Sequence, residues 1–133
     1  MDRAKIKQIV DQWAAAVAAR DLDALSALVA DDVVDTSGAT PSMGRETFRK
    51  RAATVGAAFG DIDVRVEDLV IENDRAAWRW LLSGAHVGTF AGVAPTGRRA
   101  SFRGINFQRF DNGKVVEHWT MVDAASLMKQ LTG

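Results

Sequence analysis

Few residue types in this chain of 133 residues could carry out chemistry. The chain has no Cys and no Tyr, which excludes thiol nucleophiles, thiolate metal ligands, disulfides and phenolic acids. Its only imidazoles are His86 and His118, and two His are too few for most metal sites. Carboxylates, these two imidazoles and amides are therefore the candidate catalytic groups, and we expect no metal site.

Asp123 is the foremost candidate for a general acid or base. It stands between Met121-Val122 and Ala124-Ala125, and apolar surroundings disfavour an ionised carboxylate and raise its pKa. The same position, directly before an apolar helical segment, is where an N-cap is expected. The residues alone leave both roles open, and capping is the more common one.

A hairpin signal, Asp111-Asn112-Gly113-Lys114, predicts which side chains accompany Asp123. A two-residue turn at Asn112-Gly113 fixes the pairing of the strands on either side. One face of the pair then carries Phe102, Gly104, Asn106, Gln108, Glu117, Trp119, Met121 and Asp123. Asp123 would thus end an apolar wall with two amides nearby. A three-residue loop with a bulge would shift this register by one residue.

The preceding strand adds aromatic and imidazole candidates. By strand parity, His86 shares a face with Trp78, Trp80 and Phe90. His86 is as consistent with a hydrogen-bonded core residue as with a pocket acid or base. The tryptophans can be core, ligand platform or both. Asp35 stands where an early helical segment leads into the expected mouth of the fold.

The elements that must position these residues follow an α+β order. Apolar residues recur at helical spacing first and with a period of two after Gly60. We expect helices over 2–19, 22–29, 45–59 and 124–131, and strands over 31–35, 62–66, 75–90, 99–110 and 115–123. Glycines within the long strands indicate a strongly bent sheet, which the N-terminal helices would close into a cone with an interior pocket. We treat residues 1–133 as a single domain.

Composition excludes several classes of partner. Lys and Arg total 17, as do Asp and Glu, and a neutral surface argues against nucleic acid or an anionic membrane. The N-terminus lacks an apolar signal core, and the apolar run 13–19 is too short to span a bilayer. We therefore expect a cytoplasmic globular protein.

Several motifs together resemble the SnoaL-like polyketide cyclase family. They are His86-Val-Gly-Thr-Phe-Ala-Gly92, Pro95-Thr-Gly-Arg98, the hairpin Arg109–Trp119, Asp123, and Leu127 with Gln130-Leu131. The opening helix and residues 28–34 are also similar to that family, so the resemblance covers nearly the whole chain. It implies the nuclear-transport-factor-2-like α+β cone.

The resemblance also implies cofactor-independent, aldol-type ring closure on an apolar, polycyclic aromatic polyketide. By matching position, Asp123 would abstract the proton, Asn106 and Gln108 would hold substrate oxygens, and His86 would be a second catalytic group. The remaining substrate-binding candidates are Trp78, Trp80, Phe90, Phe102, Trp119, Met121 and Asp35. Because a shared fold does not transfer a reaction, alternatives stay open: a hydroxylase, isomerase or epoxide-opening enzyme, or a non-catalytic binding or dimerisation module.

The outer face of the sheet predicts a homodimer. In the predicted register it carries Ile105, Phe107, Val116 and Val122 beside Arg103, Arg109 and His118. An apolar sheet face needs cover, and no further helix remains in the sequence to provide it.

Overall fold

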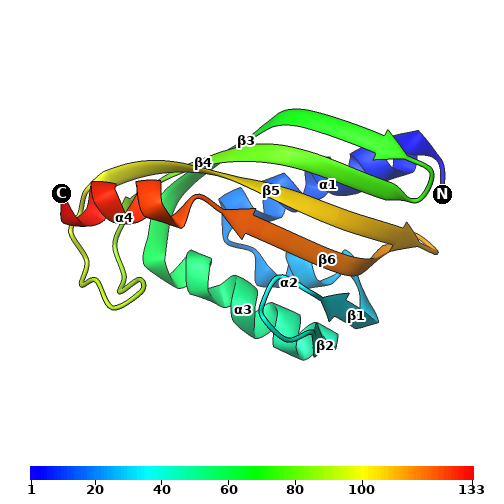
Figure 1. The fold of residues 1–133 in the computed structure, drawn as a ribbon, viewed down its shortest axis with the longest axis horizontal. Coiled ribbons are helices and arrows are strands. Elements are labelled where there is room, and N and C mark those ends of the chain that lie inside the picture. The colour runs from blue at the N-terminus through cyan, green and yellow to red at the C-terminus, as the bar shows by residue number, and fades with distance from the viewer.

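The computed structural model describes residues 1–133 as four helices and six strands (Figure 1). The N-terminal part comprises α1 (Arg3–Ala19), α2 (Leu22–Ser26), β1 (Val29–Asp35), β2 (Ser42–Met43) and α3 (Arg45–Ala58). It is followed by β3 (Phe59–Glu72), β4 (Arg75–His86), β5 (Arg99–Asp111), β6 (Lys114–Val122) and α4 (Ala124–Thr132). This order confirms the predicted α+β class. The two-residue strand β2 is the one element that the sequence did not suggest.

Aspartates begin three of the four helices. The side chains of Asp2, Asp21 and Asp123 each accept a hydrogen bond from the backbone N–H three residues later. Each contact satisfies a donor that the first helical turn leaves without a partner. The buried face of α1 includes Ile6 and Ile9, as its apolar periodicity predicted.

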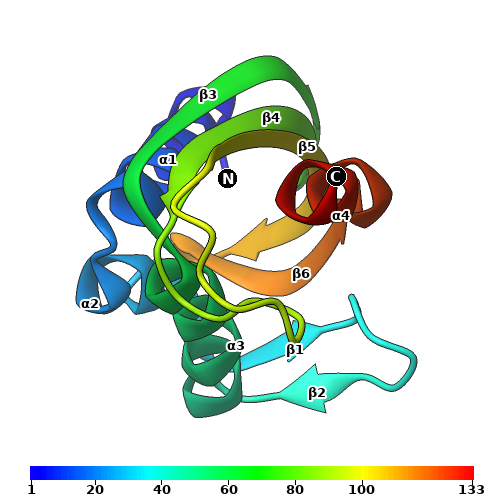
Figure 2. The same cartoon turned by 90° about the vertical axis from the view of Figure 1, so that its left-hand side faces the viewer.

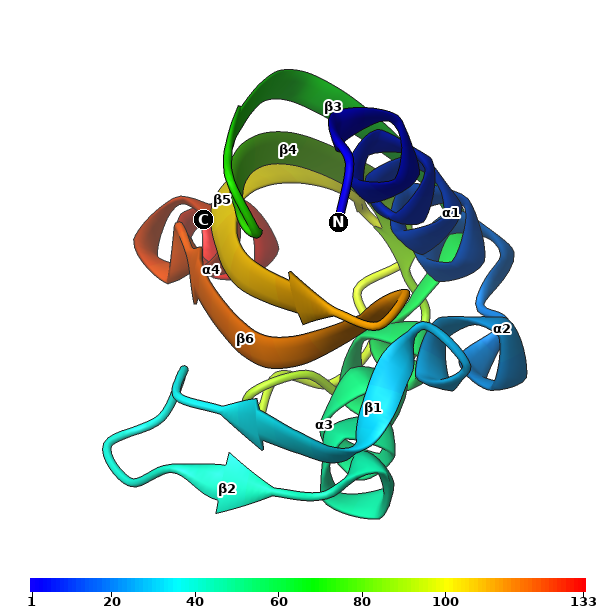
Figure 3. The ribbon, with the colours of Figure 1, turned by 90° about the vertical axis from the view of Figure 1, so that its right-hand side faces the viewer.

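The six strands form one mixed sheet in the order β2-β1-β6-β5-β4-β3. Neighbouring strands are antiparallel except for β1 and β6, which are parallel. The two end-on views show that the sheet curls strongly, with α1 lying along β3 and α3 near β1 (Figures 2 and 3). The bent sheet closed by N-terminal helices is therefore confirmed.

The β5–β6 hairpin departs from the predicted register. Asp111 pairs with Lys114 as expected, and Phe110 with Val115, but Arg109 pairs with Glu117. Val116 is thus an extra residue, a β-bulge, and a one-residue shift moves every later side chain of β6 to the opposite face. The predicted shared face was wrong beyond this point: the inward-facing residues are His118, Thr120 and Val122.

Strand β4 ends at His86 instead of continuing to Phe90 as predicted. The chain there passes close to α3, since a Cβ atom at Gly88 would lie 2.1 Å from the carbonyl oxygen of Ala57. Only a glycine allows this approach of the chain to α3. None of the helices is long and apolar enough to cross a membrane.

Candidate active site

The concave face of the sheet and helices α1 to α3 line a pocket of about 680 Å³. Of its 28 lining residues, 19 are hydrophobic. The aromatic walls are Trp13, Phe48, Trp78, Trp80, Phe90 and Phe102. A volume and lining of this kind suit a largely apolar small molecule.

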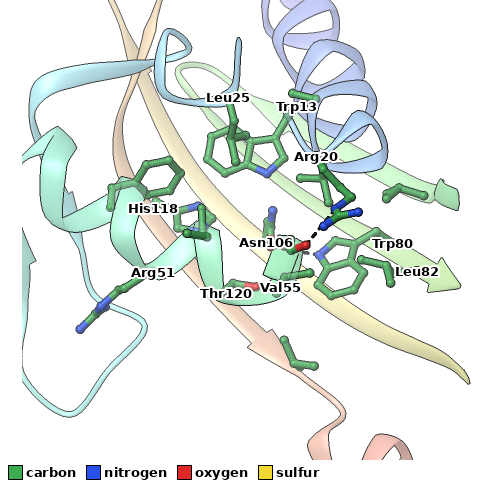
Figure 4. Close-up of a pocket in the computed structure, with 18 of the residues that line it drawn as sticks. Trp13, Arg20, Leu25, Arg51, Val55, Trp80, Leu82, Asn106, His118 and Thr120 are labelled. Atoms are coloured by element: carbon green, nitrogen blue, oxygen red, sulfur yellow. Dashed lines mark hydrogen bonds between the residues drawn. The ribbon is translucent and has the colours of Figure 1, made fainter. Parts of the chain in front are cut away.

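One end of the pocket, which we call the polar end, collects Asp35, Ser37, Asn106, His118 and Thr120. The sheet register explains the grouping: Asn106 lies opposite Thr120 on β5 and β6, and Asp35 of β1 lies beside His118. In the close-up, Asn106, His118 and Thr120 lie on neighbouring parts of the pocket wall, with Trp13 and Trp80 beside them (Figure 4). A few polar groups in an apolar pocket can orient a substrate and stabilise charge that develops on it.

Asn106 is held by Trp80. The indole Nε1–H of Trp80 donates to Oδ1 of Asn106 at 3.0 Å, and both side chains are buried. Because an indole nitrogen is only a donor, this bond fixes which end of the amide is oxygen. The NH₂ group of Asn106 makes no bond within the chain and remains as the donor on the pocket side.

His118 is buried between aromatic rings. It stacks on Trp13 at 5.0 Å between ring centroids and meets the edge of Phe48 at 5.6 Å. Its Nδ1 lies 3.0 Å from Nε2 of Gln108. Burial lowers the pKa of His118 to about 4, although the neighbouring Asp35 carboxylate opposes this effect. His118 is therefore neutral at neutral pH.

Asp35 is the carboxylate of the polar end and is 5% exposed. Burial by itself would raise its pKa, but hydrogen bonding to Ser37 and the positive charges of His118, when protonated, and Arg51 together outweigh burial, and the pKa is lowered. Oδ1 accepts from the Ser37 N–H at 2.8 Å, and Oδ2 lies 3.4 Å from Nη1 of Arg51. At neutral pH, where His118 is neutral, the charge of the pair resides on Asp35.

The structure brings together six of the residues predicted for the substrate site. The pocket is lined by Asn106, Trp78, Trp80, Phe90, Phe102 and Asp35. Gln108 is fully buried behind this wall, bonded to Trp78 and His118. Trp119 and Met121 pair with Phe107 and Ile105 on the outer face of the sheet, so their predicted place in the pocket was wrong. The bulge at Val116 causes this difference.

The predicted place of Asp123 in the pocket was also wrong. Its side chain is exposed, accepts from the Ser126 N–H at 3.1 Å and caps α4. Asp123 therefore lacks the apolar burial that its neighbours in the sequence suggested. The alternative that the residues left open, a helix cap, is the one that the structure has.

His86 does not line the pocket either, contrary to its predicted assignment. It is completely buried, and its Nδ1 lies 3.0 Å from Oγ1 of Thr96 and accepts from the Thr96 N–H at 3.2 Å. The ring packs 5.8 Å from that of Phe59. These contacts tie the loop after β4 to the core, which is the structural role weighed for His86.

Sequence reasoning missed His118, Thr120 and Ser37 at the polar end, and Trp13 and Phe48 in the aromatic walls. His118 was expected on the outer face or at an interface, and only the bulge, which the hairpin prediction named as its alternative, places the side chains of His118 and Thr120 inward. No three His, Asp or Glu side chains come together as a metal-binding group.

Comparisons with known proteins agree with this fold. Residues 7–131 match the family model of the SnoaL-like polyketide cyclases. Aklanonic acid methyl ester cyclase AcmA of Streptomyces galilaeus is 37% identical over 95 residues, which are 69% of this chain and 65% of that enzyme. Nogalonic acid methyl ester cyclase of Streptomyces nogalater is 32% identical over 91 residues, 66% of each chain. The matches thus span slightly less than two thirds of either cyclase.

A solved structure is similar over almost the whole chain. AclR, a proposed hydroxylase from Streptomyces galilaeus, superimposes with a TM-score of 0.89 and 31% identity over 98% of this chain and 82% of its own. The matched residues include nearly every element that forms the pocket. Because this family model covers almost the whole chain, the chain belongs to the SnoaL-like polyketide cyclase family.

Proposed function

We propose that this protein is a cofactor-independent cyclase that closes a ring of a polycyclic, largely apolar polyketide by an intramolecular aldol reaction. The observation that carries this proposal is an apolar pocket with one carboxylate and two N–H donors at its polar end. The similarity to two enzymes named as methyl ester cyclases supports it.

In this proposal Asp35 is the general base. It takes a proton from a substrate carbon, and the resulting enolate oxygen receives hydrogen bonds from Asn106 and His118. The enolate carbon then forms a bond to a carbonyl carbon of the same molecule, and the proton returns to the new alkoxide. Because its contacts keep Asp35 ionised, it is a weak base. The carbon it deprotonates is therefore an acidic one, flanked by two carbonyl groups.

The test uses the substrates after which the relatives are named. Purified protein is incubated with aklanonic acid methyl ester or nogalonic acid methyl ester, and products are followed by chromatography with mass spectrometry. An aldol addition gives an isomer of unchanged mass. Asp35→Asn should abolish its formation, whereas Asp123→Asn, an equal change outside the pocket, should not. Isomer formation by the Asp35→Asn protein would overturn the assignment of the base.

A hydroxylase is the second candidate, and the similarity to AclR favours it. It predicts a product with one additional oxygen atom instead of an isomer. A non-catalytic binding module predicts that the ester binds in the pocket and is recovered unchanged. The same incubation therefore separates the three functions.

We also propose that two copies associate through the outer face of the sheet. In the observed register, four neighbouring strands align the exposed or partly exposed apolar side chains Val70, Ala77, Phe107 and Trp119, with Ile105 and Met121 beside them. We call this set the outer apolar patch. Val122 and His118, predicted for this face, point inward instead, and Trp119 and Met121 take their place.

A further inference from the structure

We infer that Trp78 and Gln108 are positioning residues that fix the tautomer of His118, so that the neutral imidazole carries its proton on Nε2. The chain of contacts begins at Trp78, whose Nε1–H donates to Oε1 of Gln108 at 2.9 Å. An indole nitrogen cannot accept, so this bond identifies the oxygen of the Gln108 amide. The amide nitrogen must then be the atom that faces His118.

The second contact sets the imidazole. Nε2 of Gln108 lies 3.0 Å from Nδ1 of His118, and an amide NH₂ can only donate. Nδ1 must accept, which leaves the proton of a neutral ring on Nε2. Gln108 is 0% exposed and Trp78 is 2% exposed, so water does not compete for either contact.

The protonated nitrogen is free to act on a ligand. Nε2 of His118 makes no hydrogen bond within the protein, and it is not among the polar atoms that are sealed from solvent without a partner. His118 lines the pocket, so this N–H opens onto it. The charged group that acts on the imidazole is Asp35 of β1, which Arg51 of α3 pairs with, while α1 contributes the ring of Trp13.

A parallel arrangement occurs two residues away on the same strands. Trp80 pairs with Gly104 but donates diagonally to Asn106, and Trp78 pairs with Asn106 but donates diagonally to Gln108. Two indoles of β4 therefore orient two amides of β5. The result is two N–H donors at the polar end, one from Asn106 directly and one from His118 through Gln108.

The catalytic meaning of this arrangement rests on the proposed function. A neutral imidazole that donates from Nε2 can hold an enolate oxygen without giving up its proton, because a neutral imidazole, unlike an imidazolium, is a very weak acid. The opposite tautomer would present a lone pair to that oxygen and repel it. Trp78 and Gln108 would thus determine whether His118 stabilises the enolate.

Nitrogen-15 NMR of the imidazoles tests the tautomer without any substrate. The chain has only two His, so loss of one signal set in His118→Gln assigns the spectrum. At neutral pH the unmodified protein should show His118 protonated on Nε2 alone. A spectrum with the proton on Nδ1 would overturn the inference, whatever the behaviour of any variant.

Two variants test the relay itself. Gln108→Glu replaces the donor with a carboxylate oxygen, so at about pH 9, where Glu is ordinarily ionised, Nδ1 should gain the proton. Trp78→Phe frees the amide to turn, so both tautomers should appear. The matched control is Trp80→Phe, which removes the equivalent indole bond to Asn106 and should leave the His118 tautomer unchanged. Retention of Nε2–H alone in both test variants, or an equal change in the control, would contradict the relay.

Turnover is a separate readout. If the proposed function holds, Gln108→Glu should lower kcat roughly 100-fold, the effect of losing one oxyanion donor, with a smaller change in KM. If neither ester is converted while the tautomer responds as described, the proposed function fails and the relay stands. If turnover is present and Gln108→Glu changes the tautomer without lowering kcat, the catalytic meaning of the relay fails.

Discussion

The indole of Trp80 lies against Gly104, so closely that a Cβ atom at residue 104 would be 2.2 Å from its Cζ2 atom. The two residues are direct partners across β4 and β5. Because residue 104 has no side chain, the ring can lie over this position of the strand and extend its N–H to Asn106. The orientation of the pocket amide thus depends on a glycine that does not itself line the pocket.

Gly104→Ala should therefore destabilise the protein and impair the site. A rigid indole and backbone must give way to the added methyl group, and such overpacking costs about 1–3 kcal/mol of unfolding free energy, measured by urea denaturation. The displaced ring should also release Asn106 and lower turnover. Gly56→Ala is the control. Residue 56 lies within α3, and a Cβ atom there would meet nothing within 4 Å. This substitution should therefore stabilise the helix by about 0.5–1 kcal/mol. Equal stability of Gly104→Ala and the unmodified protein would contradict this account.

Substitution of Asp123 should affect stability and not catalysis. Asp123→Ala removes the N-cap of α4 and should cost about 1 kcal/mol, whereas Asp123→Asn keeps a good capping residue and should cost only a few tenths. Urea denaturation measures both. With folded protein, turnover of either variant should stay near that of the unmodified chain, and a large loss of kcat in Asp123→Asn would restore the catalytic role that the sequence suggested.

The sequence predicted elements that depend on local signals. The periodicity of α1, the helix cap weighed for Asp123 and the turn at Asn112-Gly113 are all set by residues within a few positions of each other. The inward face of β6 depends on distant partners instead. At the bulge, the Val115 N–H donates to the carbonyl oxygen of Leu28 at 2.9 Å, so β6 joins β1 where it leaves its register with β5. Nothing in the local pattern around Val115 records that contact, and the face that holds His118 was therefore missed.

The buried imidazole of His118 should make stability depend on pH. Its pKa is about 4 in the folded protein and about 6.5 when unfolded, so between these values the unfolded chain binds a proton that the folded chain does not. Unfolding free energy should therefore fall as pH decreases from about 6.5 to about 4, by up to about 3 kcal/mol. The lowered pKa of Asp35 acts in the same direction at the acidic end.

Urea denaturation at several pH values measures this slope. His118→Gln removes the titrating group and should flatten the decrease between about pH 6.5 and 5, where an exposed carboxyl contributes little. His86 remains in that variant, so any residual slope has another origin. An identical slope in both proteins would show that His118 is not the source of the pH dependence.

The outer apolar patch should hold a dimer that one charge disrupts. Phe107, at the centre of the outer apolar patch, is 44% exposed. Ion pairs between Arg103 and Glu67 and between Arg109 and Glu117 border the patch. Since these charges already have partners, they can flank an apolar contact without being left unpaired when water is excluded. Phe107→Glu should bury an unpaired carboxylate against the second copy and weaken association by at least about 2 kcal/mol.

Sedimentation of the unmodified protein at micromolar concentration should give a dimer and that of Phe107→Glu a monomer. Met43→Glu provides the matched control, because Met43 is 66% exposed on the edge strand β2, outside the patch, and carries the same new charge. It should remain dimeric. A monomeric unmodified protein would exclude this dimer. Equal dissociation of both variants would exclude this face as the interface, because the effect would then not depend on where the charge is placed.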